Sequence, residues 1–154
     1  MFRSSTALRI REVPKMTSET EPEGVVSASN YVSGNWPWCA FDKNVATFWM
    51  GTLRTNEWLA YQFTAPVFVH TVSLLVADTI ACPRNVQVQK SEDGVNWIDA
   101  TSILILKRTT DLQNIFVSSA GFASMWRLLI RDTYGAAPAI GELNFIGFEQ
   151  LQSD

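Results

Sequence analysis

The chain has 154 residues, of which 47% are hydrophobic and 18% charged, and its formal net charge is −3. This length and balance are typical of one globular domain whose core can fold without disulfide bonds. The acidic balance argues against nucleic-acid binding, which needs a basic face, and no stretch reaches the roughly 18 apolar residues of a membrane span.

Residues 1–22 differ in composition from the rest of the chain. They begin basic, end acidic and polar, and contain few apolar residues. They lack the apolar core of a signal peptide, so we expect synthesis in the cytoplasm. The segment is either a disordered tail or an arm that orders against a partner subunit. We therefore expect a flexible arm over residues 1–22, a domain over residues 23–150 and a tail over residues 151–154.

The domain reads as a series of short strands. Runs rich in Val, Ile, Phe, Trp and Thr alternate with Gly, Pro, Asn and Asp, and no long segment has helical periodicity. In NVQVQKS, Val86 and Val88 would face the core, and Gln87 and Gln89 the solvent. This pattern predicts an all-β, antiparallel sandwich or barrel. The expected strands are residues 25–29, 58–63, 69–76, 85–91, 97–98, 103–106, 115–117, 125–130 and 143–148.

The reactive side chains give no sign of catalysis. Cys39 and Cys82 match no zinc spacing, and we interpret them as apolar core residues, although a single bridge between them stays open. His70 is the only histidine, and we expect it to face outward from a strand. G-x-S-x-G and H-E-x-x-H motifs are absent. We therefore expect a protein that is not an enzyme.

Four segments carry a resemblance to a known family. They are CAFDKNVATFWMG, EWLAYQFTAPVFVHTVSL, NVQVQKSEDGVNW and MWRLLIRDTYGAAPAIGELNFIGF. In this order they resemble the discoidin domain, also called the coagulation factor type-C domain, one of the galactose-binding-like sandwiches. The resemblance covers residues 24–149 and implies a jelly-roll-like β-sandwich. Lys43 stands where the family usually has Gly. The tryptophans that match the family's core are Trp49, Trp58, Trp97 and Trp126.

The resemblance also implies a structural calcium ion near the first segment. Calcium takes about six to eight oxygen ligands. Asp42 and Glu142 would supply carboxylates, Thr47 a hydroxyl, and Asn44 or Lys43 a carbonyl. The alternative is that Asp42 caps its own turn and Glu142 pairs with an arginine.

The loop over residues 33–38 is the most suggestive surface feature. Pro37 separates two tryptophans and stiffens their presentation. In the family this end of the sandwich carries ligand-binding loops, in which aromatic rings stack on sugars while Asn and Arg read hydroxyl groups. The alternative is that one or both tryptophans fold onto the core or a neighbouring subunit. The candidate ligand-binding residues are Trp36, Trp38, Arg54, Asn56 and Tyr134.

Two functions are compatible with these features. The first is a glycan-binding or receptor-binding module, which follows from the resemblance and the tryptophan loop. The second is a structural protein of a virion, such as a phage tail, baseplate or capsid decoration, whose arm and sandwich bind other subunits or copies of itself. The second rests on the arm and on the lack of an attached catalytic domain or export signal. We expect neither a nucleic-acid partner nor membrane insertion.

Overall fold

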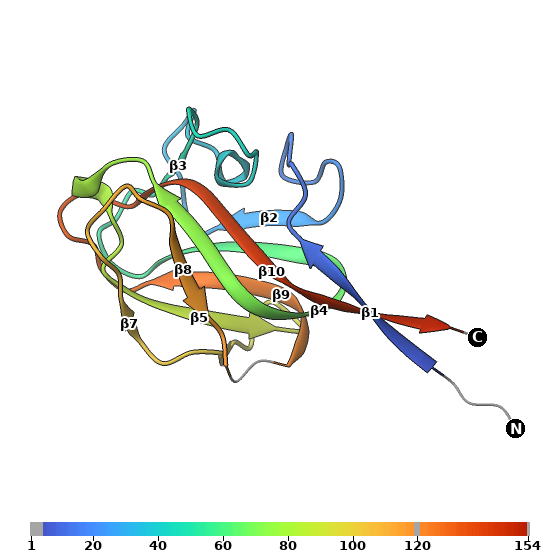
Figure 1. Cartoon of the computed structure of the whole chain (residues 1–154). Coiled ribbons are helices and arrows are strands. Elements are labelled where there is room, and N and C mark those ends of the chain that lie inside the picture. Colours follow the sequence, from blue (N-terminus) through green and yellow to red (C-terminus); the bar gives the residue numbers. More distant parts are fainter. Residues whose placement is uncertain (1–4, 119–120, 154) are drawn as a thin grey trace, which may run out of the picture.

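The computed structural model describes residues 5–118 and 121–153, and within them the fold is all-β (Figure 1). Every strand pairing in this part of the chain is antiparallel, so the predicted antiparallel β-sandwich is confirmed. The elements are β1 (Ser5–Glu12), β2 (Val25–Ala28), the 3-10 helix η1 (Pro37–Ala40), β3 (Trp49–Met50), β4 (Glu57–Val76), the 3-10 helix η2 (Thr79–Ala81), β5 (Asn85–Ser91), β6 (Ile98–Asp99), β7 (Leu104–Ile105), β8 (Gln113–Phe116), β9 (Phe122–Ile130) and β10 (Ala139–Ser153).

The strand β4 joins the two layers of the sandwich. Residues 57–62 pair with β2 and β9, whereas residues 67–76 pair with β10 and β8 and keep only Val67 and Phe68 paired with β9. The register with β9 shifts between these halves, next to Pro66, which has no N–H for the ladder. The two strands predicted over residues 58–63 and 69–76 are therefore one bent strand. Its bend places β2, β9, β5 and β6 in one layer and β1, β10 and β8 in the other.

The core lies between the layers and follows the two-residue alternation of the strands. Trp49 and Trp126 are fully buried there, as the resemblance implies. The same expectation is wrong for Trp58 and Trp97, which are only half-buried. Trp58 faces outward because its neighbour Leu59 faces the core. The core residues include Val26, Tyr61, Phe63, Val72, Leu74, Val86, Val88, Leu128, Ile130, Leu143 and Phe145.

The outer face of β5 is covered by another segment of the chain and is not exposed to solvent. Gln87 and Gln89 are only 5% and 7% exposed, so the prediction that they face solvent is wrong. The segment that follows β6 folds back over this face. The side-chain amide of Gln87 donates to the carbonyl of Thr101 (2.9 Å), and that of Gln89 donates to Asp99 (2.8 Å). These bonds let two polar side chains be buried without losing their partners.

Residues 5–22 are attached to the sandwich. β1 pairs with β10 over its whole length, and Figure 1 shows the two strands leaving the body as a ribbon that ends in both termini. Val13 and Met16 are buried in the core, and the N–H of Met16 donates to the carbonyl of Phe41 (3.0 Å). From residue 5 onward the expected arm is therefore an ordered strand paired with β10, it reaches the core at Val13, and residues 1–4 lie outside the described part. Of the expected tail, residues 151–153 belong to β10.

The cysteines and the histidine occupy structural positions. Cys39 and Cys82 are both buried, which confirms their interpretation as core residues, and both thiols are free. Burial raises the pKa of each thiol. His70 lies on the outer face of β4, half-buried, with its ring 5.1 Å from that of Phe148.

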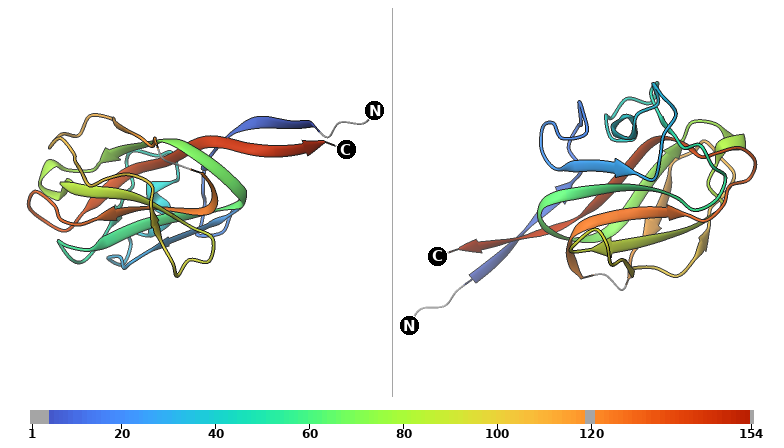
Figure 2. Two further views of the ribbon diagram at one scale, coloured as in Figure 1. Left: turned by 90° about the horizontal axis from the view of Figure 1, so that it is seen from below. Right: turned by 180° about the vertical axis from the view of Figure 1, so that it is seen from behind.

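Several connections between strands lie at one end of the sandwich. The connections over residues 29–56, 77–84, 106–112 and 131–138 gather at the end of the sandwich away from the termini (Figure 2). We call this the loop end. The described residues contain no helix long and apolar enough to span a bilayer.

Candidate ligand-binding site

Backbone hydrogen bonds join the connections of the loop end into one surface. Four of the five bonds link two different connections, and the bond from Val32 links two parts of one connection, so the loops support one another. The donor N–H groups and acceptor carbonyls are Val32 to Met50 (2.9 Å), Gly51 to Pro138 (2.9 Å), Asn56 to Arg131 (3.3 Å), Tyr134 to Cys82 (3.0 Å) and Leu106 to Arg84 (2.8 Å).

Glu57, at the start of β4, organises the loop that precedes it. Its side chain is buried, and its carboxylate accepts from the hydroxyl of Ser29 (2.9 Å), the amide of Asn30 (2.6 Å) and the backbone N–H of Thr52 (3.0 Å). These bonds clamp residues 51–56 against the end of β2. Sequence reasoning missed Glu57, whose only signal is a charged residue at the head of an apolar strand.

The clamped loop displays two of the predicted ligand-binding side chains. Arg54 and Asn56 are both exposed. Asn56 has a φ of 58°, a left-handed conformation that asparagine tolerates better than most residues. Both side chains therefore project into solvent from a rigid support, where they can donate hydrogen bonds to a ligand.

Trp36 forms an aromatic pair at the surface. Its ring lies 5.2 Å from that of the exposed Tyr31, at an interplanar angle of 56°. Pro37, buried at the start of η1, fixes the backbone that follows Trp36. Trp36 itself is half-exposed, so part of its ring is open to a ligand. Sequence reasoning missed Tyr31, although it lies in the same connection.

Trp38 has different surroundings from Trp36. It packs against the core and lines an open depression of about 340 Å³ beside the predicted calcium loop. The structure thus brings Trp38 together with the candidate calcium ligands and not with its fellow tryptophan. The depression is lined by Lys15, Met16, Thr17, Trp38, Asp42, Asn44 and Thr47.

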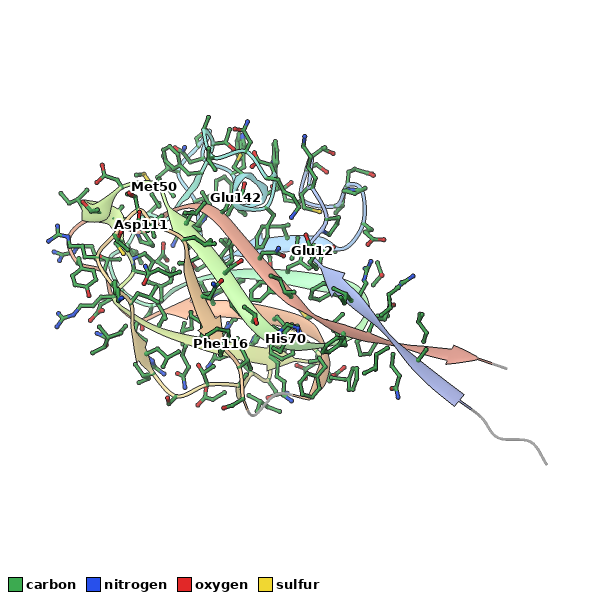
Figure 3. The ribbon with its side chains drawn as sticks, in the orientation of Figure 1. Glu12, Met50, His70, Asp111, Phe116 and Glu142 are labelled. Carbon is green, nitrogen blue, oxygen red and sulfur yellow. The ribbon has the colours of Figure 1, made fainter. Side chains whose placement is uncertain are left out.

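The four predicted calcium ligands come together beside the start of β10. Asp42 accepts from the N–H of Asn44 (3.0 Å) and from the hydroxyl of Thr47. Glu142, labelled in Figure 3, lies close to Asp42. Among the described residues, its buried Oε1 has no hydrogen-bond partner. Burial, followed by the nearby Asp42 carboxylate, raises the pKa of Glu142 to about 7. Two carboxyl groups are therefore held together at a cost in free energy.

This donor set fits a calcium ion. An unpartnered carboxylate oxygen beside a second carboxylate is an arrangement that a bound cation stabilises. Lys43 has a φ of 56°, so the turn keeps a left-handed conformation at the position where the family usually has Gly. Clusters of three or more His, Cys, Asp or Glu side chains are absent from the described residues, so further ligands would be hydroxyl or carbonyl oxygens. Of the two alternatives, the Asp42 turn is present, whereas no ion pair joins Glu142 to an arginine in this part of the chain.

Tyr134 lies where three connections meet. Its hydroxyl donates to the carbonyl of Leu106 (2.5 Å), and its half-buried ring packs on the core. The guanidinium carbons of Arg84 and Arg108 each lie 5.7 Å from the centre of the ring. Neither arginine was predicted, because each sits in its own connection with no local motif. A shallow polar depression of about 360 Å³, lined by residues 107, 109 and 111–114, lies in the connection that carries Arg108.

Comparison with solved structures shows that this chain has the fold of the galactose-binding-like sandwiches. No protein-family model and no curated protein sequence matches this chain. The family 32 carbohydrate-binding module of NanJ from Clostridium perfringens, solved with galactose, has a TM-score of 0.74 at 14% identity and covers 90% of this chain and 99% of its own.

Two further solved structures share this fold. A second family 32 module from Clostridium perfringens, solved with GalNAc-β-1,3-galactose, has a TM-score of 0.72 at 14% identity and covers 80% of this chain and 94% of its own. An F5/8 type C domain from Bacteroides fragilis has a TM-score of 0.68 at 16% identity, with 80% and 91% covered. At these identities the likeness establishes the discoidin-like fold.

Proposed function

We propose that this chain is a non-catalytic carbohydrate-binding module whose loop end binds a glycan, either free or on a cell-surface receptor. The observation that carries this proposal is that the loop end presents both an aromatic pair and exposed hydrogen-bonding side chains, in a fold whose neighbours were solved with sugars. Those sugars are galactose, GalNAc-β-1,3-galactose and, in the AlyQ module, 4,5-unsaturated mannuronic acid.

The loop end suits this role because it is organised before any ligand arrives. The Trp36–Tyr31 pair offers an aromatic surface to the apolar face of a sugar ring. Arg54 and Asn56 supply donors for hydroxyl groups. The buried Glu57 holds their loop in place, so little conformational entropy is lost on binding.

Titration with glycans tests the proposal. We expect hits on a glycan array, followed by measurable affinity in calorimetry, and a loss of about tenfold or more in Trp36→Ala. Phe116→Ala is the matched control, since it removes an aromatic ring that is 75% exposed on β8, outside the loop end. An array without hits, or equal losses in both variants, would contradict the proposal.

We also propose that Asp42, Asn44, Thr47 and Glu142 hold a structural calcium ion. The unpaired Glu142 oxygen and the paired carboxylates support this proposal. When bound, calcium would neutralise the two carboxylates and tie the loop over residues 42–47 to β10. Isothermal titration with calcium chloride after treatment with EDTA should show one site per chain, and no heat of binding would contradict it.

A structural role in an assembly is the second candidate, and the outer face of the β1 layer favours it. Leu8, Ile10 and Phe116 are 60%, 70% and 75% exposed, and Phe68 and Phe148 lie between them. Figure 3 shows Phe116 and His70 on this layer. β1 is also an edge strand of the sheet, and a free edge can accept another strand. Under this proposal the face packs on copies of the chain or on other subunits of a virion, such as a phage tail, baseplate or capsid decoration.

The mass of the purified protein in solution tests the assembly role. We expect an oligomer that dissociates in Ile10→Lys, because this change places a charge in the apolar face. A monomer at high concentration, together with absence from purified particles, would contradict it. Synthesis in the cytoplasm suits a virion subunit, and a virion subunit can also bind glycans, so both proposals can hold.

A further inference from the structure

Two arginines lie near the ring of Tyr134 at the loop end. From their geometry we infer that the glycan is acidic, a carboxylated or sulfated oligosaccharide, and that Arg84 and Arg108 contact its charged groups. This inference rests on the proposed glycan binding and names the class of sugar.

The tyrosine is a fixed platform. Its hydroxyl donates to the carbonyl of Leu106 (2.5 Å) and its backbone N–H donates to the carbonyl of Cys82 (3.0 Å). Its ring also packs against the core. A ring held at three points cannot swing away, so the charges gathered around it have a constant position relative to the fold.

The two guanidinium groups are held near this platform. Each lies 5.7 Å from the ring centre of Tyr134, within the range of a cation–π contact. Arg108 is held further by a bond from its Nε to the carbonyl of Thr79 (3.1 Å), and the carbonyl of Arg84 accepts from Leu106 (2.8 Å). Because both groups lie 5.7 Å from the same ring centre, the two guanidinium carbons are separated by no more than twice that distance, and one oligosaccharide can reach both.

Within residues 5–118 and 121–153, neither guanidinium forms an ion pair. The ion pairs in the described residues involve Arg9, Arg11 and Lys43, and Arg84 and Arg108 take part in none of them. In a chain of net charge −3, two unpaired arginines on one ring form a local positive site. Both groups carry a positive charge in water-exposed positions, where they attract an anion.

The acidic groups of the neighbouring segments are occupied elsewhere or exposed. The carboxylate of Asp132 accepts from the backbone N–H (3.0 Å) and the side-chain amide of Asn85 (2.9 Å). Asp78 accepts from the N–H of Ile80 (3.0 Å) at the start of η2. Asp111 lies exposed in the same connection as Arg108. None of these carboxylates pairs with Arg84 or Arg108, so the two guanidinium groups are available to a ligand.

The hydrogen-bond geometry of the guanidinium group favours an anionic ligand over a neutral sugar. A planar guanidinium matches a carboxylate or sulfate through two parallel hydrogen bonds, whereas a neutral sugar hydroxyl uses only one. The depression in the same connection, which Asp111 also lines, offers Lys107 and Thr109 as further partners for hydroxyl groups. An acidic oligosaccharide satisfies both features, because it carries charges at intervals along a chain of hydroxyl-bearing rings.

Calorimetry on the full chain tests this inference with three probes: trigalacturonic acid, galactose and sodium sulfate. We expect trigalacturonic acid to bind best and to bind about tenfold more weakly in Arg84→Gln and in Arg108→Gln. Arg9→Gln is the matched control, because it removes the same charge from β1 at the other end of the molecule. Raising sodium chloride from about 50 to about 500 mM should weaken the binding, since salt screens these contacts.

The outcomes separate this inference from the proposed function. Binding of galactose that equals or exceeds that of trigalacturonic acid, with no loss in either arginine variant, would overturn the acidic ligand and leave glycan binding intact. Equal affinity for sodium sulfate at the same arginines would show a simple anion site and would also overturn it. Failure of every sugar, on these probes and on a glycan array, would overturn the proposed function itself.

Discussion

Replacing Glu142 by glutamine tests whether two carboxyl groups are held together at the loop end. The pKa of Glu142 is raised to about 7 from an ordinary value of 4.5, by burial and then by Asp42. One pKa unit corresponds to about 1.4 kcal/mol, so an ionised Glu142 destabilises the metal-free protein at about pH 8 by at most about 3 kcal/mol. The side chain is only half-buried, and solvent screening reduces this to about 1–2 kcal/mol.

The sign of the pH dependence follows from the raised pKa. Below about pH 4.5 the carboxyl group is protonated in both the folded and the unfolded chain, and its contribution to stability is fully present. As the pH rises to about 7, the unfolded chain releases this proton first, and the contribution is lost. Without metal, the wild type should therefore lose stability between about pH 5 and pH 8 relative to Glu142→Gln, which has no such group.

Thermal unfolding in EDTA and in calcium chloride measures both effects. In EDTA at about pH 8, Glu142→Gln should melt roughly 3–6 °C above the wild type. With calcium the order should reverse, because the wild type keeps a charged ligand. Glu92→Gln, a change of an exposed residue in the turn after β5, is the control and should change neither value. A lower melting temperature for Glu142→Gln in EDTA would refute the electrostatic reasoning, and no response of the wild type to calcium would refute the metal site.

Three further substitutions test the support of the sheet and of the loop end. Glu57→Ala should lower the free energy of unfolding by about 3 kcal/mol, since it leaves several donors of the loop end unpaired; a urea titration that shows less than about 1 kcal/mol would contradict this role. Gly147→Ala should cost about 3 kcal/mol or more, because its Cβ would overlap the carbonyl of Phe68 in the paired strand, and a melting curve like that of the wild type would disprove the clash. Tyr134→Phe should cost about 1 kcal/mol in the same titration by leaving the carbonyl of Leu106 without its donor, and an unchanged midpoint would show that this bond contributes nothing.

Much of the sandwich could be predicted, because a strand with one buried face has alternating apolar and polar residues. Val86 and Val88 face the core as their spacing indicates, and Trp126 is buried as its match to the family implies. The attachment of β1 was not predictable in this way. Arg9 donates a hydrogen bond to Glu149, 140 positions away, and no local sequence pattern predicts such a partner. Burial of Gln87 likewise depended on a segment that folds back from β6.

The candidate sites also differ in how far the sequence could predict them. Asp42, Asn44 and Thr47 form a local turn, so a motif could indicate them, and only the resemblance connected them with Glu142. Arg84 and Arg108 stand in separate connections, and no spacing relates either of them to Tyr134.

By itself the sequence determined that the chain forms short strands with one apolar face each, because side-chain direction alternates along any extended backbone. Tertiary structure alone decided which connections meet at the loop end and which charges remain unpaired there. Those properties depend on distances between residues far apart in the chain, and such distances exist only after the two layers have packed.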